Sequence, residues 1–437
     1  MTDATHSSQV IPRNGVVRLR LPFAGPIIQR MMAIYVVLMF FVSANVLDTI
    51  GYDYSSIDGS PIMKIHVATY FLVALFGLFI VSYPQKSDLF RYYLATKLGT
   101  IYFFLACTFA LINIVLEGRN GFGMYFDTDL NLFLCCMLLP FVSPANMTRL
   151  ERFVHWFFAL NAVYAIFDLA TGIKFFPLIA YSPDGITTIE SRAAGFLSHP
   201  LHAATITSVY VVSLLTGAGR ELRPNLRNPM IVLQMGALLA FGGRTAFILM
   251  LLILSLTVLW RSFRFLAGVR IAHRDIVVAV ASLPIGIAAL SLMAAMGAFD
   301  QLLERFVEDG GSARSRVLMV PLIRSFNWGD LLWGASTDYV RSQIYSFGLE
   351  WGVENPFLQI GVFQGVVIAL LIMVGFLLLL YDVYNRLSPR VIFPMMIFVA
   401  LCSTFGSFSQ RFTAFAIFIV VISALFRRDD APTEHVY

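Results

Sequence analysis

Long apolar runs separated by polar connections are the feature that most constrains this chain. Runs of about 18 or more apolar residues are long enough to cross a bilayer as helices. Hydrophobic residues make up 58% of the sequence and charged residues only 13%, so a soluble protein of this length would have no core large enough to hold the runs. The sequence therefore predicts an all-α, polytopic integral membrane protein.

The apolar runs predict about twelve transmembrane helices. They lie at about 27–47, 65–83, 96–116, 128–143, 152–171, 198–217, 228–242, 244–260, 275–297, 356–382, 391–407 and 411–426. The chain then divides into an N-terminal tail (1–26), nine spans (27–297), a polar segment (298–355), three spans (356–426) and a C-terminal tail (427–437). The first tail is basic and has no small-residue cleavage site after a short apolar core, so it is expected to be retained.

The distribution of basic residues predicts the orientation of the spans. Placing the N-terminus inside assigns 20 of the 31 lysines and arginines to cytoplasmic connections, as the positive-inside rule requires. Both termini are therefore predicted to be cytoplasmic. The net charge of +5 follows from these residues facing an anionic leaflet, so membrane lipid is the expected partner and nucleic acid is not.

The segment 298–355 is the longest polar stretch and is predicted to form one large outer loop containing short helices. A long insertion in a compact protein is usually a functional site or lid. The loop contains five arginines, namely Arg305, Arg314, Arg316, Arg324 and Arg341. Each of them has two interpretations, binding of an anionic substrate or an ordinary contact with lipid phosphate or a nearby acid.

Three further arginines, Arg192, Arg244 and Arg411, lie at the predicted outer ends of spans beside small residues. Guanidinium stays charged and presents a planar fork of donors that matches phosphate oxygens. An arginine at membrane depth is costly unless it faces protein, water or an anion, so Arg244, which follows the Gly242-Gly243 turn, is a functional candidate. We expect the three arginines to face a common cavity that binds a diphosphate or a carboxylate.

The stretch RAAGFLSHP (192–200) predicts a helix start suited to an anion. Ser198 is expected to cap the first turn, and Pro200 fits there because its missing N–H would be unpaired anyway. His199 and His202 are three residues apart, but no acidic or cysteine partner is near in sequence. His199 is therefore assigned to substrate binding, and no metal or cofactor is expected. The four cysteines lie within apolar runs and are interpreted as packing residues.

The stretch ENPFLQ (354–359) begins the tenth predicted span. Glu354 and Asn355 directly precede Pro356, so the carboxylate would lie at a helix N-terminus, where its negative charge is stabilised. It is either a capping acid or a base that accepts a proton from a hydroxyl group.

The motifs RAAGFLSHP, GGRTA, the arginine-containing loop and ENPFLQIGVFQG occur in this order across 192–365. In order and spacing they resemble the O-antigen ligase and Wzy-type polysaccharide polymerase superfamily. The resemblance implies about a dozen spans in a bacterial inner membrane, a large periplasmic loop, and arginines that bind an undecaprenyl-diphosphate-linked oligosaccharide. It further implies a chain-length regulator and a flippase as partner proteins.

On that resemblance Arg192 and Arg244 correspond to the family's membrane-boundary arginines, and Arg316 corresponds to its loop arginine. Arg244, Arg316 and Glu354 are expected to be catalytic. The expected substrate-binding residues are Arg192, Arg314, Arg324, Arg411, His199 and Asn355. Ligases of this group carry histidine where this chain has Glu354, which favours a polymerase of capsule or exopolysaccharide repeat units, or a divergent ligase. In either case the expected enzyme is a metal-independent glycosyltransferase, acting in exopolysaccharide or O-antigen biosynthesis. An O-antigen ligase that transfers glycan to lipid A core, and a flippase of lipid-linked oligosaccharide, stay as alternatives.

Overall fold

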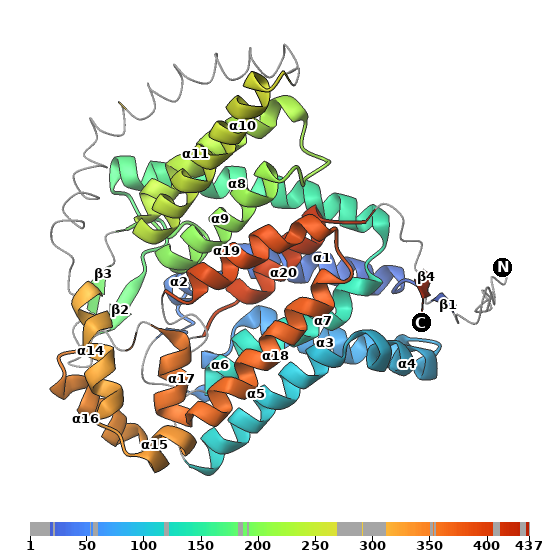
Figure 1. The fold of residues 1–437 in the computed structure, drawn as a ribbon. Coiled ribbons are helices and arrows are strands. Elements are labelled where there is room, and N and C mark those ends of the chain that lie inside the picture. The colour runs from blue at the N-terminus through green and yellow to red at the C-terminus, as the bar shows by residue number, and fades with distance from the viewer. Residues whose placement is uncertain are drawn as a thin grey trace.

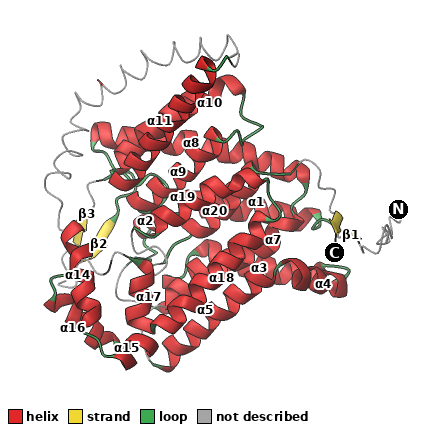
Figure 2. Ribbon diagram, viewed as in Figure 1, coloured by secondary structure: helices red, strands yellow, loops and turns green. Residues whose placement is uncertain are grey.

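The computed structural model describes residues 18–20, 22–52, 54–55, 60–117, 122–181, 187–189, 192–268, 291, 312–349, 353, 355–404, 411–428 and 434–436. Helices dominate the described residues, and the four strands are three residues each (Figures 1 and 2). Strand β1 (Arg18–Arg20) pairs antiparallel with β4 (Glu434–Val436), and β2 (Ile179–Tyr181) pairs antiparallel with β3 (Thr187–Ile189). The all-α prediction is confirmed at this level.

Five described helical segments are long and apolar enough to cross a membrane. They are α5 (Leu98–Leu116), the Phe122–Phe141 segment, α8 (Pro144–Thr171), α11 (Arg244–Leu266) and α18 (Val366–Tyr384). The Phe122–Phe141 segment runs through α6 (Phe122–Met124), the π-helix η2 (Tyr125–Leu130), α7 (Asn131–Leu138) and η3 (Leu139–Phe141). These segments support a membrane-embedded protein, while the number of twelve spans stays a prediction.

Other helices fall at or beside the remaining predicted spans. They are α1 (Pro26–Phe41), α2 (Ala44–Thr49), α3 (Val67–Ser82), α9 (Pro200–Leu215), α10 (Pro224–Phe241), η4 (Pro389–Val391), α19 (Ile392–Cys402) and α20 (Ala414–Leu425). Two short helices, η1 (Pro61–Lys64) and α4 (Lys86–Thr96), occupy connections. The ninth predicted span, 275–297, lies outside the described residues except for Ser291.

Proline and polar caps explain where several helices begin. Pro26, Pro144, Pro200, Pro224 and Pro356 each occupy the first turn of a helix. Proline is favoured there because the first amides of a helix have no acceptor within the helix. Capping side chains accept from these amides in three of the cases, where the caps are Ser143, His199 and Asn355.

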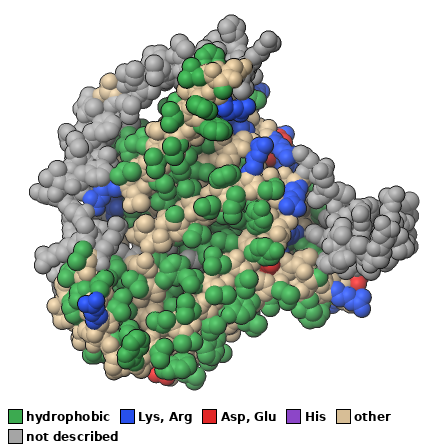
Figure 3. Space-filling view, viewed as in Figure 1, with side chains coloured by type: hydrophobic (Ala, Val, Ile, Leu, Met, Phe, Trp, Pro, Cys, Tyr) green, Lys and Arg blue, Asp and Glu red, His purple; other side chains and the backbone are tan. Residues whose placement is uncertain are grey.

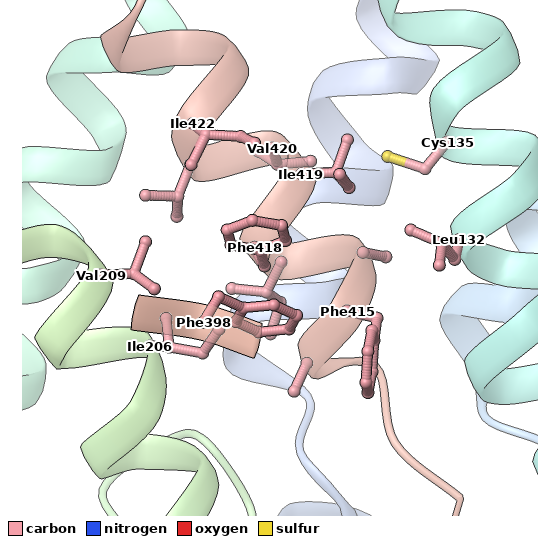
Figure 4. Close-up of a cluster of buried hydrophobic side chains, with 14 of the residues drawn as sticks. Leu132, Cys135, Ile206, Val209, Phe398, Phe415, Phe418, Ile419, Val420 and Ile422 are labelled. Carbon is pink, nitrogen blue, oxygen red and sulfur yellow. The ribbon is translucent and has the colours of Figure 1, made fainter. Parts of the chain in front are cut away.

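Helix α20 lies at the centre of the hydrophobic core. All of its 12 residues are buried, and it packs against α7, α8 and α9. Figure 4 shows side chains of α20 between those of α7, α9 and α19. The Phe398 and Phe418 rings stack with their centroids 3.8 Å apart. A helix that is apolar on all sides fits this central position.

Helices α5 and α18 pack closely because glycine lies between them. A Cβ atom added to Gly375 of α18 would lie 2.8 Å from the Phe103 Cα of α5. Small residues of this kind let two helix backbones approach within a membrane. Apolar side chains cover the outer faces of α5, α11 and α18, among them Leu105, Leu256 and Leu377 (Figure 3), as expected for surfaces that contact lipid.

Several of the predicted cytoplasmic connections meet, in their described parts, at one end of the bundle, which we call the basic end. Ala24 N donates to Phe141 O at 3.1 Å, Arg427 Nη2 lies 2.7 Å from Glu151 Oε2, and Arg390 Nη1 donates to Thr216 O at 3.3 Å. Lysine and arginine side chains gather mainly along the right-hand side of the face in Figure 3. The predicted grouping of these connections on one side agrees with this arrangement.

The described residues 312–349 of the segment predicted as the outer loop form a small helical lobe. Its helices α14 (Ser312–Arg324), α15 (Trp328–Trp333) and α16 (Thr337–Ser346) enclose a separate core that includes Leu322, Phe326, Val340 and Ile344. The tenth predicted span, 356–382, is divided in the structure. Helix α17 (Pro356–Gln364) packs against α15, and Gly365 with φ 96° separates it from α18.

Candidate functional site

The predicted site residues that the structure describes with their side chains lie mostly at the end of the bundle away from the basic end, which we call the opposite end. Arg192 is half-buried in the segment before α9. Ala193 N donates to Ala240 O at 3.3 Å, which holds this segment against the end of α10. Lys174 Nζ donates to Arg192 O at 2.9 Å and lies 3.9 Å from Asp168 Oδ1. The position of Arg192 is therefore fixed from two sides.

Arg244 begins α11 directly beside α9. A Cβ atom added to Gly243 would lie 2.7 Å from Ala204 Cβ, so only glycine allows the first turn of α11 to lie this close to α9. Arg244 is half-buried there. Because α10 ends at Phe241 and contacts the Arg192 segment, Arg192 and Arg244 flank the N-terminal half of α9.

The N-terminus of α9 is capped by a different residue from the one predicted. His199 is the cap, and its Nδ1 accepts from Leu201 N at 3.2 Å. Ser198 instead adopts φ 65°, and its Oγ accepts from Ala44 N at 3.0 Å. The prediction that Ser198 is the cap is therefore wrong, because a contact with α2 holds its side chain away from the helix.

The first turn of α9 contacts the segment that contains Arg411. The rings of His199 and His202 have centroids 5.1 Å apart, and the His202 ring lies 3.5 Å from that of Phe412. Phe412 N donates to Thr128 Oγ1 at 3.0 Å, which ties this segment to η2. Arg411 and His199 are thus brought to neighbouring positions.

Asn355 reaches the same end from the lobe. Its Oδ1 accepts from Phe357 N and Leu358 N at 3.0 and 3.1 Å, so it caps α17. Its Nδ2 donates to Ser403 O at 3.4 Å, and Ser403 follows α19, which packs along α9. Asn355 therefore connects the lobe to the helices that surround His199.

A buried polar network lies under Arg411. Arg411 Nη1 donates to Tyr54 O at 2.9 Å, and its guanidinium carbon lies 5.3 Å from the centre of the Tyr54 ring. Tyr54 Oη donates to Asp127 Oδ2 at 2.7 Å. Asp127 also accepts from His66 N at 2.9 Å and from Thr69 Oγ1 at 2.7 Å. The Asp127 carboxylate is fully buried, and these donors replace the water that it loses.

The network continues into the core, and it changes the pKa of Tyr54. Asn131 Nδ2 donates to Thr69 Oγ1 at 3.0 Å, and Tyr35 Oη donates to Asn131 Oδ1 at 2.5 Å. Burial, together with the neighbouring carboxylate of Asp127, raises the pKa of Tyr54 well above its ordinary value. Tyr54 therefore stays protonated and keeps its donor role at neutral pH.

The structure does not bring all the predicted residues together. Arg324 is exposed on α14, at the surface of the lobe. Arg314 and Arg316 lie on the same helix, but their side chains are outside the described residues, and so is Glu354. Among the residues that the structure describes, no group of three His, Cys, Asp or Glu side chains is placed to hold a metal ion.

Sequence reasoning missed Asp127 and its partners. This buried and fully paired carboxylate belongs to the stretch YFDTDLN (125–131). Two acids at the start of an apolar run are expensive in a membrane and point to partners from other helices. That signal was present in the sequence, whereas the partners Tyr54, His66 and Thr69 were not identifiable from it.

No protein-family model matches this sequence, and no curated protein matches it.

Proposed function

We propose that this chain is a membrane glycosyltransferase that polymerises undecaprenyl-diphosphate-linked oligosaccharide repeat units on the periplasmic face of a bacterial inner membrane. One observation carries the proposal. The half-buried residues Arg192, Arg244 and Arg411, far apart in sequence, lie at the same end of the bundle around the N-terminal half of α9. The basic end then faces the cytoplasm, and both termini lie on that side.

Half-buried guanidinium groups suit a diphosphate at the membrane boundary. Arg192 and Arg244 approach from two connections, so a ligand between them would receive donors from two directions. Arg411 is already oriented by Tyr54 O and keeps further N–H groups for a ligand. Positioned donors of this kind stabilise charge that develops on a leaving group.

The proposed reaction needs no redox partner and no metal. A hydroxyl oxygen of one glycan forms a bond to the anomeric carbon of another, whose bond to the diphosphate oxygen breaks. The electron pair of that bond leaves with the undecaprenyl diphosphate, and the hydroxyl proton passes to a base, for which we propose Glu354. Alignment of the two glycans contributes up to about 7–11 kcal/mol of barrier reduction, and Asn355 is proposed to help position them.

Reconstitution tests the proposal directly. Lipid-linked repeat units that accumulate in a deletion strain are supplied to proteoliposomes containing the purified chain. Lengthened lipid-linked glycans are the expected product, and their formation should depend on Arg244. Transfer only to added lipid A core would assign a ligase. Movement of the units across the bilayer without any new glycosidic bond would contradict the glycosyltransferase and assign a flippase.

A further inference from the structure

A cavity of about 300 Å³ opens among the helix termini of the basic end. Its cationic lining residues are Lys97 before α5, Arg386 after α18, and Arg427 and Arg428 after α20. Among the residues that the structure describes, no acidic side chain lines the cavity. It lies at the end of the bundle away from Arg192 and Arg244, so it belongs to a different site from the one proposed for glycosyl transfer.

Two of the four cations already have protein partners. Arg427 Nη2 lies 2.7 Å from Glu151 Oε2, and Arg427 Nη1 donates to Thr148 Oγ1 at 2.5 Å. Arg428 Nε donates to Leu387 O at 2.8 Å. These two arginines are thus held in place around the cavity, and Arg427 is neutralised locally.

The other two cations form no ion pair of 4.0 Å or less within the described part of the chain. Lys97 is only 1% exposed, and within the described part of the chain its ammonium group makes no hydrogen bond and no ion pair of 4.0 Å or less. Arg386 packs 5.9 Å from the Tyr92 ring centre, and its Nε is buried without a hydrogen-bond acceptor among the described residues. The neighbouring acid Asp382 already accepts from Thr100 N at 2.7 Å.

Lys97 is buried and has no close ion pair among the described residues, which is costly, so a negatively charged ligand would stabilise it. Apolar side chains, including Phe23, Leu139, Val142 and Leu387, form the rest of the wall. A small hydrated anion gains nothing from such a wall, whereas a ligand with hydrocarbon next to its charge does. Basic pockets between membrane helices on the cytoplasmic side bind anionic headgroups for this reason.

We propose that this cavity binds the phosphate group of an anionic phospholipid, with the phosphate between Lys97 and Arg386 and the acyl chains leaving along the apolar wall. The cavity is too small for a whole lipid, so it selects the headgroup. The proposal does not depend on the reaction catalysed at the opposite end.

Lipid retention by the full-length purified chain tests this site. Native mass spectrometry after exchange into micelles containing phosphatidylglycerol or phosphatidylcholine counts the lipids that stay bound. We expect one phosphatidylglycerol to be retained by the wild type, with affinity lower by roughly tenfold in Lys97→Met and in Arg386→Gln. Arg91→Gln is the matched control, because Arg91 is an exposed cation of α4 outside the cavity.

The variants remain informative because Lys97→Met removes a buried charge that forms no close ion pair among the described residues, and this should not prevent folding. Equal retention of the two lipids by the wild type would overturn the proposal, as would unchanged phosphatidylglycerol retention in both cavity variants. If inorganic phosphate at millimolar concentration displaces the lipid completely and raises the melting temperature equally, a free anion is the ligand and the lipid assignment is wrong.

Discussion

Tyr54 Oη donates a 2.7 Å hydrogen bond to Asp127 Oδ2, joining the connection after α2 to the buried start of the Phe122–Phe141 segment. The same tyrosine lies under Arg411 and accepts from its guanidinium through the backbone oxygen. One residue thus links a half-buried arginine of the candidate site to a carboxylate in the core. The position of Arg411 is therefore expected to depend on Tyr54.

Removal of the Tyr54 hydroxyl should destabilise the protein. Tyr54→Phe leaves Asp127 with one donor fewer, at an expected cost of about 1–3 kcal/mol in the free energy of unfolding. Thermal unfolding in detergent measures the change. Tyr52→Phe is the matched control, because the Tyr52 hydroxyl donates at 3.2 Å to the backbone oxygen of Ile65 and not to a carboxylate. Equal destabilisation by the two substitutions would contradict a special role for the Asp127 contact.

The hydrogen bond between Tyr54 and Asp127 predicts that its contribution to stability declines at high pH. The pKa of Tyr54 is raised in the folded state by burial and by Asp127, so its stabilising contribution is complete below the pKa of an unfolded tyrosine, about 10. Above that pH the unfolded chain loses the Tyr54 proton while the folded chain keeps it, and the contribution declines. The difference in melting temperature between wild type and Tyr54→Phe should therefore be constant from pH 7 to 9 and shrink above about pH 10.

Arg244→Lys should abolish most glycosyl transfer while the protein remains folded. Lysine keeps the charge but loses the planar fork of donors. Chain lengthening in proteoliposomes and the melting temperature are the two measurements. Arg261→Lys, at the exposed end of the same helix, should retain wild-type activity. Full activity of the Arg244 variant would show that this arginine contacts lipid and has no role in glycosyl transfer.

Glu151→Gln should be strongly destabilising. Glu151 is fully buried and lies 2.7 Å from Arg427, whose side chain is 21% exposed, so loss of the carboxylate should cost about 1.5–3 kcal/mol, as for a hydrogen bond to a charged group. Glu221→Gln is the control, because Glu221 is partly exposed and its nearest contact with Arg427 is 3.7 Å; about 1 kcal/mol or less is expected there. Unfolding in mixed micelles measures the loss of stability in each variant. Similar losses in the two variants would show that Glu151 is not the main partner of Arg427.

Two glycine substitutions test the close packing of α5 and α18. Gly375→Ala places a methyl group 2.8 Å from Phe103 Cα and should destabilise the protein by about 1–3 kcal/mol. Gly77→Ala in α3 has no atom within 4 Å of the new methyl and should stabilise it by up to about 1 kcal/mol through helix propensity. Opposite shifts in melting temperature are expected. A stabilised Gly375 variant would show that the two helices separate easily.

The proposed orientation can be read from accessibility to a membrane-impermeant maleimide. The four native cysteines are buried, so introduced cysteines report their own positions. Ser342→Cys, exposed on α16, should be labelled in spheroplasts, and Ser87→Cys, exposed on α4, only after the membrane is opened. The reverse pattern would place the lobe in the cytoplasm and remove the basis for a periplasmic reaction.

The long apolar helices were the part of the fold that the sequence could predict. Helices such as α5, α8 and α11 lie within the predicted runs, or extend them, because a span is specified by its own residues. The break at Gly365 was not predicted, since the run 356–382 is apolar enough to be interpreted as one span despite Gln359 and Gln364, and the break depends on α15 packing over it. The hydrogen-bond partners of Asp127 could not be predicted either, because Tyr54, His66 and Thr69 come into contact with it only in the folded chain.

The bend at Gly365, between α17 and α18, forms a rigid connection between the lobe and the bundle. Its backbone adopts φ 96°, and a Cβ atom there would lie 2.7 Å from the Trp333 carbonyl carbon, so the end of α15 closes over the bend. Asn355 is bonded to Ser403 at the other end of α17. Because both ends of α17 are held, the lobe and the membrane part should move together. A displacement of the lobe would therefore shift α18 and, through it, α5, and Gly365 would not act as a hinge.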